Sequence, residues 1–365
     1  MPKPPPSCNA APAPARKGRG AVTNVSGRYE KDCREAFDDG WSSTDPEPPP
    51  LKTEITVETA RTIITRNDSP DLSFDRTINP YRGCEHGCVY CYARPNHAYA
   101  GLSPGLDFES RLFAKPNAAA LLEAELADPR YVPNTIVLGG VTDVYQPIER
   151  TWKITRSLLE VLAAHRHPVA LVTKSALVLR DLDILAPMAA AGLAKVAVSV
   201  TTLDPKLARV MEPRAAAPHR RIETIRTLAA AGVPTSIMTA PLIPSLNDHE
   251  IDALLDAAAA AGAGAAGYVA LRLPLEIAAL FQEWLHAHVP DRAARVMKLV
   301  RGMRGGRDYD PRWGARQRGE GPYAAMMAQR FRAAARRTGL DKPRRQLDVT
   351  QFRRPPKPGD QLPLL

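Results

Sequence analysis

Short runs of apolar and β-branched residues alternate with helical stretches between about residues 77 and 288, and no other feature limits the fold as strongly. We expect strands at 135–138, 169–173, 195–200, 236–239 and 268–271. We expect helices at 148–164, 182–191, 220–231 and 248–261, the last with Asn247 as its N-cap. Strands separated by helices form parallel βαβ units. With one more strand before Cys84, about six units fit, so the sequence predicts an α/β fold, a partial (β/α)6 TIM-like barrel.

The segments on either side of the barrel differ from it in composition. Residues 1–50 are rich in Pro, Gly, Ala and charge, and they predict a mostly disordered tail. The barrel is assigned to 51–290, followed by a basic extension over 291–341 that packs on it and a disordered tail over 342–365. Within the extension, a helical stretch with Met326, Met327 and Phe331 on one side is expected to contact the barrel.

The basic charge is concentrated near the C-terminus. The formal net charge of the chain is +10, and residues 292–365 hold 19 Lys and Arg against 6 Asp and Glu. Trp313 and Tyr323 lie among these arginines and could stack on bases while Arg312 and Arg316 contact phosphates. A solvated basic surface explains the same composition, so nucleic acid is one of two open interpretations.

The apolar runs and the cysteine content predict a protein of the reducing cytosol. No apolar run reaches the roughly 18 residues of a membrane helix, and the first residues lack the apolar stretch of a secretory signal. We therefore expect a cytoplasmic protein with no membrane partner. Two of the five cysteines, Cys8 and Cys33, fall in the Pro-rich tail and are expected to be free thiols.

The other three cysteines lie within eight residues of one another, in the order Cys-x3-Cys-x2-Cys. Cys84, Cys88 and Cys91 could hold three irons of a 4Fe-4S cluster and leave the fourth iron open to another ligand. Zinc is the competing interpretation, because His86 or His97 could complete a tetrahedral site.

This spacing resembles the signature of the radical S-adenosylmethionine (SAM) superfamily, with Tyr90 at its aromatic position. The resemblance implies that SAM binds the open iron and that an electron from the reduced cluster cleaves it. The resulting 5′-deoxyadenosyl radical then abstracts hydrogen from a substrate. An electron donor such as a flavodoxin or ferredoxin is therefore an expected partner.

A closer resemblance links residues 75–330 to the spore photoproduct lyase branch, also called the DNA repair photolyase-like group. From about residue 39 onward the chain looks like an uncharacterised bacterial subgroup of that branch, with 103–109 and 271–274 among its marks. The resemblance implies a lyase-like or modifying enzyme. Nucleic acid is the leading substrate, and a protein or small metabolite is the alternative. A non-enzymatic nucleic-acid-binding protein with a structural metal is a third interpretation.

The same resemblance assigns residues to SAM at the ends of three strands. Lys174 matches a lysine that binds the carboxylate of SAM, and Ser199 matches a serine that contacts its ribose or methionine part. The residues matched to the amino group of SAM are Gly139, Gly140, Thr142 and Asp143.

Ordinary structural roles remain open for these positions. Lys174 could pair with Asp181 or Asp183, Ser199 could satisfy a backbone group, and Asp143 could cap a turn.

One position departs from the pattern of the branch. Val141 stands where spore photoproduct lyase has a cysteine that returns hydrogen to the product radical, and a valine cannot do this. The two tyrosines beside the third cluster cysteine, Tyr90 and Tyr92, are retained. Their resemblance to the lyase implies a part in radical transfer and makes Tyr92 the candidate catalytic residue, although packing would also account for it.

Overall fold

The computed structural model describes residues 15–30, 51–343 and 345–355. Its main sheet has seven strands in the order β10-β9-β8-β7-β6-β3-β2. The strands are β2 (Ile64–Arg66), β3 (Arg76–Ile78), β6 (Ile136–Leu138), β7 (Val169–Thr173), β8 (Ala194–Ser199), β9 (Thr235–Leu242) and β10 (Ala265–Ala270). All neighbours from β3 to β10 pair in parallel, and only the edge strand β2 is antiparallel. The six parallel strands confirm the predicted partial barrel.

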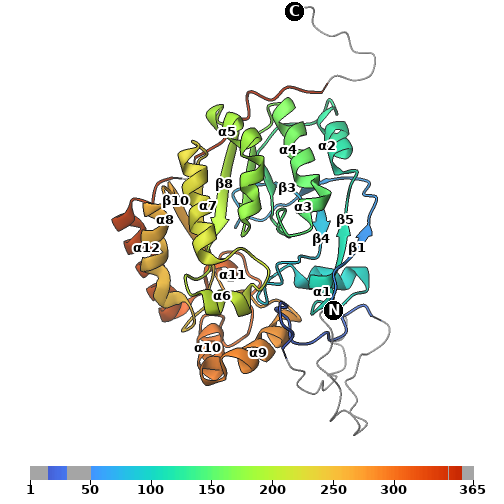
Figure 1. Ribbon diagram of the computed structural model, residues 1–365. Coiled ribbons are helices and arrows are strands. Elements are labelled where there is room, and N and C mark those ends of the chain that lie inside the picture. Colours follow the sequence, from blue (N-terminus) through green and yellow to red (C-terminus); the bar gives the residue numbers. More distant parts are fainter. Residues whose placement is uncertain (1–14, 31–50, 344, 356–365) are drawn as a thin grey trace, which may run out of the picture.

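Helices follow the strands and cover the outside of the sheet (Figure 1). The α-helices are α1 (Asp107–Ser110), α2 (Ala118–Leu126), α3 (Glu149–Trp152), α4 (Ile154–Ala164), α5 (Leu182–Ala190), α6 (Pro205–Met211), α7 (Pro218–Ala230), α8 (Ile251–Ala260), α9 (Ile277–His288), α10 (Pro290–Gly302), α11 (Ala315–Arg318) and α12 (Gly321–Thr338). Three 3-10 helices are η2 (Arg94–Ala100), η3 (Ala176–Asp181) and η4 (Asp248–Glu250). In Figure 1 the carboxyl ends of the strands point to the lower end of the view, where α6, α10 and α11 lie.

Both faces of the parallel strands are apolar, as expected for a sheet covered on both sides. On β7, Val169 and Leu171 point into the main core beneath the helices, whereas Ala170 and Val172 belong to the inner face. Phe74 and Leu347 pack against this inner face. Part of the inner face is therefore covered by one residue that precedes β3 and one from the C-terminal segment.

A second, three-stranded sheet stands beside the barrel. It has the order β1-β5-β4, with β1 (Glu54–Val57), β5 (Arg111–Ala114) and β4 (Tyr81–Arg82). Because β4 ends just before the cysteine segment, this sheet supports one side of that loop. Its strands have two to four residues, too few to show a periodicity in the sequence.

Two of the predicted helices differ in detail from the structure. The stretch 148–164 is divided into α3 and α4 at Lys153, whose φ is +52°. The side chain of Asn247 does not cap the helix that follows it, because it is buried and bonds backbone groups of Ile243, Thr201 and Pro241.

Part of the expected C-terminal tail has a defined path. The backbone of residues 345–355 crosses the amino ends of the strands, opposite the cysteine loop, at the upper end of Figure 1. Arg345 O accepts from Lys195 Nζ at 2.9 Å, the amide of Asp348 donates to Gly192 O at 3.1 Å, and the amide of Arg353 donates to His165 O at 2.8 Å. Backbone contacts of this kind do not depend on side-chain type, so composition alone did not reveal them.

The C-terminal helix α12 buries two of the three side chains that the sequence places on its apolar side. Met327 and Phe331 of α12 are buried against the barrel, whereas Met326 is exposed. Two arginines of α12 also bind acidic residues of α8, with Arg330 Nη2 2.7 Å from Asp252 and Arg337 Nη1 2.6 Å from Asp256. These pairs neutralise part of the basic extension.

The N-terminal region is also ordered in part. Residues 15–30 pack beside the cysteine loop, although the sequence predicts mostly disorder over 1–50. Cys8 and Cys33 lie outside the described residues. No helix in the described part of the chain is long and apolar enough to cross a membrane.

Candidate active site

The three clustered cysteines lie on the loop that follows β4, beyond the carboxyl ends of the barrel strands. Cys84 and Cys88 are buried, Cys91 is partly exposed, and all three are free thiols. Two successive turns shape the loop, because the amide of Gly87 donates to Cys84 O and that of Cys91 donates to Cys88 O, each at 3.2 Å. The loop thus presents its three sulfur atoms from one compact segment.

The environment of the thiols is apolar with a few nearby cations. Burial raises the pKa of Cys84, Cys88 and Cys91. The charge of Lys174 opposes this rise at Cys88, and that of Arg94 opposes it at Cys91. Neutral thiols suit burial without a metal, and a bound metal would displace their protons.

The surroundings of the cysteines fit an iron-sulfur cluster better than a zinc ion. His86 faces Asp143, with Nδ1 3.3 Å from the carboxylate but outside hydrogen-bond alignment, and His97 packs edge-on against Phe108. In the described ranges, no three Cys, His, Asp or Glu side chains converge on a position for one ion. A cluster needs less convergence, because each thiolate binds a different iron.

The residues matched to SAM gather at the ends of β6, β7 and β8. Lys174 Nζ donates to Ser199 Oγ at 3.0 Å and lies 5.8 Å from the centroid of the Tyr90 ring. No carboxylate in the described part of the chain pairs with this ammonium. Asp181 and Asp183, the alternative partners, are bound by Arg156 instead. A partly buried cation beside the cysteine loop is thus left for an anionic ligand.

Ser199 also has a backbone contact, at 3.4 Å from Ala240 O. That distance is long for a hydroxyl donor, and the contact with Lys174 is the shorter one.

Asp143 binds the protein backbone with both carboxylate oxygens. It accepts from Thr173 Oγ1 at 2.8 Å and from the amides of Lys174 at 2.7 Å and Tyr145 at 2.9 Å. Burial favours a high pKa for Asp143, but the charge of His86 and the amide donors outweigh burial and lower the pKa to about 2. Asp143 is therefore an anion that links the ends of β6 and β7.

The glycine pair before Asp143 allows two strand ends to approach closely. Gly139 has φ +87°, and a Cβ there would lie 2.2 Å from Val172 O, so only glycine fits. Gly140 O accepts from the Tyr92 hydroxyl, and Thr142 Oγ1 donates to Tyr81 O at 3.1 Å. Several oxygens that the resemblance assigns to SAM therefore already have partners within the protein.

Val141 lies next to the cysteines, packed with Cys84, Cys91, Ala93 and Phe108. The side chain at this position therefore faces the loop that carries the three cysteines (residues 84–91), which we call the cluster loop. Because it is a valine, it has no S–H group that could donate a hydrogen atom.

A buried polar cluster beside the loop was not anticipated from the sequence. The carboxylate of Glu212 accepts from Thr201 Oγ1 at 2.6 Å and from the Tyr90 hydroxyl, and it forms an ion pair with Arg221. Arg221 Nη1 also donates to Ser199 O at 3.1 Å. Tyr90 is 122 positions from Glu212, so no local pattern in the sequence links the two.

Aromatic and basic side chains line the rim beyond the strand ends. Trp313 is 55% exposed, and the centroid of its ring lies 3.9 Å from the guanidinium carbon of Arg316. Tyr92 is 43% exposed, and the centroid of its ring lies 4.9 Å from the guanidinium carbon of Arg272. Arg316 is fixed by Asp71 at 2.6 Å, whereas the buried Nε of Arg272 has no hydrogen-bond partner among the described residues. We call Tyr92, Arg272, Trp313 and Arg316 the rim residues.

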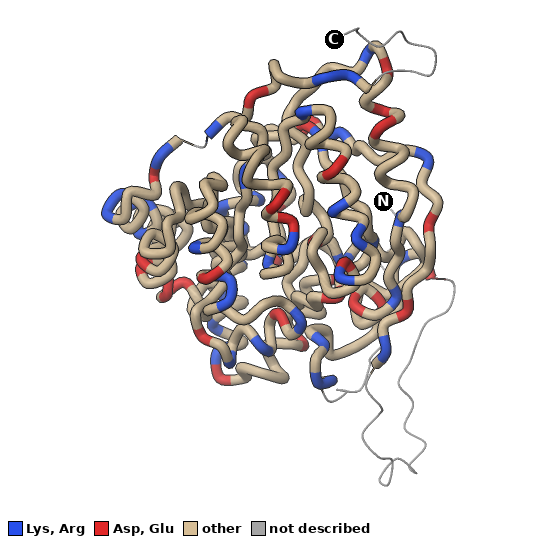
Figure 2. Tube along the Cα trace, turned by 45° about the horizontal axis from the view of Figure 1, so that its top comes forward, with Lys and Arg blue, Asp and Glu red and all other residues tan. Residues whose placement is uncertain are grey.

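Some of the remaining basic residues are paired with acidic ones, as Arg330 is with Asp252 and Arg337 with Asp256. Figure 2 shows acidic segments among the basic ones over the C-terminal helices. Arginine–aromatic contacts also occur elsewhere, as between Arg28 and the rings of Tyr29 and Tyr99. The rim residues are therefore identified by their place beyond the strand ends and not by a high local charge.

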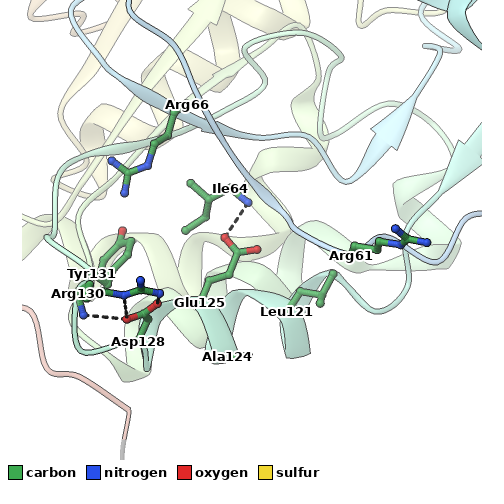
Figure 3. A pocket seen from close by; sticks show the side chains of 9 residues that line it. All are labelled: Arg61, Ile64, Arg66, Leu121, Ala124, Glu125, Asp128, Arg130 and Tyr131. Carbon is green, nitrogen blue, oxygen red and sulfur yellow. Dashed lines mark hydrogen bonds and ion pairs between the residues drawn. The ribbon is translucent and has the colours of Figure 1, made fainter.

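A hollow of about 550 Å³ lies away from this site, between β2 and α2 (Figure 3). Its carboxylates are occupied: Glu125 accepts from the amides of Ile63 and Ile64, and Asp128 binds Arg130. None of the residues assigned to SAM or to the cluster lines it.

Comparisons with known proteins agree with the geometry. Residues 78–258 match a model described as the radical SAM superfamily. An uncharacterised protein of Mycobacterium tuberculosis is 38% identical over 232 residues, which cover 63% of this chain and 68% of that protein. An uncharacterised protein of Methanocaldococcus jannaschii is 29% identical over 199 residues, covering 54% of this chain and 71% of that protein.

Solved structures with the same fold include spore photoproduct lyase complexed with dinucleoside spore photoproduct. It has a TM-score of 0.55 and 15% identity, and the match covers 78% of this chain and 79% of that one. A mutant of that lyase with bound AdoMet and dinucleoside spore photoproduct matches with a TM-score of 0.51 and 14% identity over the same shares.

Proposed function

Because this chain belongs to the radical SAM superfamily, we propose that it is a radical SAM enzyme whose substrate is a nucleic acid. Enzymes of this superfamily use a 4Fe-4S cluster and SAM. When bound, these cofactors supply an electron and a carbon-centred radical that abstracts hydrogen. The chain's own residues must hold them, exclude water and present the substrate.

The residues that would hold the cofactors are those gathered at the strand ends. Cys84, Cys88 and Cys91 would bind the cluster. The ammonium of Lys174, with Ser199 beside it, would bind the carboxylate of SAM, because it is a partly buried cation that pairs with no anion among the described residues.

The amino group of SAM would lie near Gly139, Gly140, Thr142 and Asp143. The last of these contributes a fixed negative charge. Tyr90 would lie beside the bound SAM, with its hydroxyl held by Glu212.

The rim residues carry the proposal of a nucleic-acid substrate. Exposed Trp313 and Tyr92 each stand beside an arginine, and a buried nitrogen of Arg272 has no partner within the described ranges. Nucleic-acid sites combine aromatic faces that stack on bases with cations that contact phosphates. A small apolar metabolite would not need this combination at the entrance to the barrel.

Binding of DNA oligonucleotides across a range of salt concentrations tests this proposal. With a single-stranded oligonucleotide and its duplex as probes, fluorescence anisotropy should show affinity that falls steeply with salt. Arg272→Gln should reduce the salt slope by about one, and Trp313→Ala should weaken binding by about tenfold. Arg336→Gln, on the exposed face of α12, is the matched control and should change little.

Two results would separate the alternatives. If neither rim variant binds DNA more weakly than the Arg336→Gln control, the rim residues do not recognise nucleic acid. A protein or small metabolite then becomes the better proposal for the substrate. Release of 5′-deoxyadenosine from SAM by the anaerobic enzyme is a separate measurement of the radical chemistry and does not depend on that outcome.

Tyr92 is the candidate catalytic residue at the rim. Its ring is exposed toward the entrance and its hydroxyl donates to Gly140 O, beside the position where Val141 replaces the lyase cysteine. Tyr92→Phe should leave iron content unchanged and reduce product formation. An unchanged rate of product formation would assign Tyr92 to packing alone.

A further inference from the structure

Arg94 is completely buried three residues after Cys91, and all five of its N–H groups have partners. Nε donates to Cys88 O at 2.9 Å and Nη2 donates to Gly87 O at 3.1 Å. Nη1 donates to Pro104 O at 3.0 Å and to Gly105 O at 2.9 Å. One side chain therefore binds the cluster loop to the segment that precedes α1.

The fifth contact of Arg94 is an ion pair with Glu109, at 2.5 Å, and neither side chain is exposed. Glu109 also accepts from the amides of Gly20 at 2.9 Å and Ala21 at 2.8 Å. The carboxylate thus connects Arg94 to the N-terminal segment. No SAM-assigned residue takes part in this network.

The N-terminal segment is in direct backbone contact with the cluster loop. A Cβ on Gly20 would lie 1.8 Å from Gly87 O, so any other residue would push the two segments apart. The two backbones are therefore packed directly against each other at this point.

We propose that Arg94 and Glu109 are positioning residues that act through the cluster loop and set the reduction potential of the cluster in opposite directions. Reduction adds one electron to a group already held by three thiolates. A buried cation beside the loop favours the reduced state, and a buried carboxylate disfavours it, because water does not screen either charge. This inference rests on the proposed cluster at Cys84, Cys88 and Cys91.

The two charges can be separated by a pair of variants. Glu109→Gln keeps the shape of the side chain and leaves Arg94 charged, so the midpoint potential should rise. Adding Arg94→Gln to that variant removes the remaining charge without leaving a buried carboxylate that could take up a proton. The double variant should be at least tenfold harder to reduce than Glu109→Gln, which for one electron is about 59 mV.

Redox titration of the anaerobically reconstituted proteins, followed by electron paramagnetic resonance, measures these potentials. Arg76→Gln is the matched control, since Arg76 is a buried, ion-paired arginine at the amino end of β3. It should leave the potential unchanged. Equal potentials in Glu109→Gln and the double variant would overturn the proposal.

The positioning role has a readout that needs no cluster. In the cluster-free protein, Arg94→Lys keeps the charge but cannot reach four carbonyls, so the thiols should react faster with a disulfide reagent while the potential of the reconstituted protein stays near that of the wild type. Thiol reactivity equal to the wild type in both Arg94→Lys and the double variant would refute the positioning role. If Arg94 variants do not fold, the rise expected for Glu109→Gln still tests the electrostatic role, because an unchanged or lower potential refutes it.

Failure of this inference and failure of the proposed function are distinguishable. A wild-type protein that binds no iron and sulfide would remove the cluster itself. A wild-type cluster with unshifted potentials in the variants would remove only the roles of Arg94 and Glu109.

Discussion

At the scale of single residues, the site depends on charged side chains whose electrostatic interactions are strengthened by burial. In the part of the chain that the structure describes, Lys174 has a hydroxyl and an aromatic face beside it but no carboxylate, whereas Asp143 has donors on both oxygens. Glu212 and Arg221 neutralise one another within the core. Each of these groups has a different predicted response to substitution.

Replacing Lys174 tests its assignment to SAM. Lys174→Gln should weaken SAM binding by about ten- to a hundredfold, because a charge-assisted hydrogen bond contributes about 1.5–3 kcal/mol. Equilibrium dialysis of the reconstituted protein with SAM measures this. Lys195→Gln, whose ammonium contacts Arg345 O at the other end of the barrel, is the control and should bind SAM normally. Equal affinity in both variants would contradict the assignment.

Replacing Glu212 tests the buried ion pair. Glu212→Gln leaves Arg221 buried without its anion and should lower the free energy of unfolding by about 3–5 kcal/mol. Glu223→Gln breaks the exposed pair with Arg226 and should lower it by less than about 1 kcal/mol. Urea unfolding of the two variants gives the comparison, and similar losses would show that Arg221 does not need Glu212.

At the scale of elements, the ends of the strands are shaped by segments distant in sequence. Asn247 bonds backbone groups at the end of β9 instead of starting a helix. At the opposite end of the barrel, residues 345–355 lie across the strand starts and insert Leu347 against Val137 and Ala170. Both segments satisfy backbone groups in loops next to the strands, where the hydrogen bonds of the sheet do not reach.

Removing the C-terminal segment tests its structural part. A chain ending at residue 343 should have a lower midpoint in thermal unfolding, since it loses the backbone contacts of Arg345, Asp348 and Arg353 and exposes the inner face. Leu347→Ala alone should lower the free energy of unfolding by about 2 kcal/mol or more. A truncated chain as stable as the full one would mean that the segment only rests on the surface.

At the scale of the whole molecule, two buried histidines make the free energy of unfolding depend on pH. Burial lowers the pKa of His97 and of His167 to about 4. His167 is held neutral between the hydroxyl of Tyr131 at 2.7 Å and Pro168 O at 3.1 Å. The unfolded chain, with a histidine pKa near 6.5, takes up protons at a higher pH than the folded protein does.

The protein should therefore lose stability on mild acidification. Above about pH 6.5 neither histidine lowers the free energy of unfolding, because both are neutral in the folded and the unfolded chain. As the pH falls toward 4, only the unfolded chain takes up protons, and the free energy of unfolding falls by about 2 kcal/mol per histidine between pH 7 and pH 5. Denaturant unfolding at several pH values measures this dependence. His167→Phe should be less stable at neutral pH but should show a weaker pH dependence than the wild type. An unaltered dependence would assign the acid sensitivity to other groups.

Much of the fold and the metal site was predictable because the relevant signals are local. Apolar runs and helical stretches mark the parallel strands, and the cysteine spacing places three thiols on one loop. The proximity of Lys174 to Ser199 was predictable for a related reason, whereas their assignment to SAM came from the resemblance and stays a prediction. Carboxyl ends of parallel strands meet at one edge of a sheet, so strand boundaries alone bring them together.

The sequence by itself thus determined the barrel, the thiols and the residues at the strand ends. Only the tertiary structure decided how the cluster loop is held, since Arg94, Glu109 and Gly20 join three segments whose spacing follows no local period. The same is true of the contact of Glu212 with Tyr90, 122 positions apart. Such contacts depend on which segments meet when the chain collapses, and the free energy of burying a charge then selects its partner.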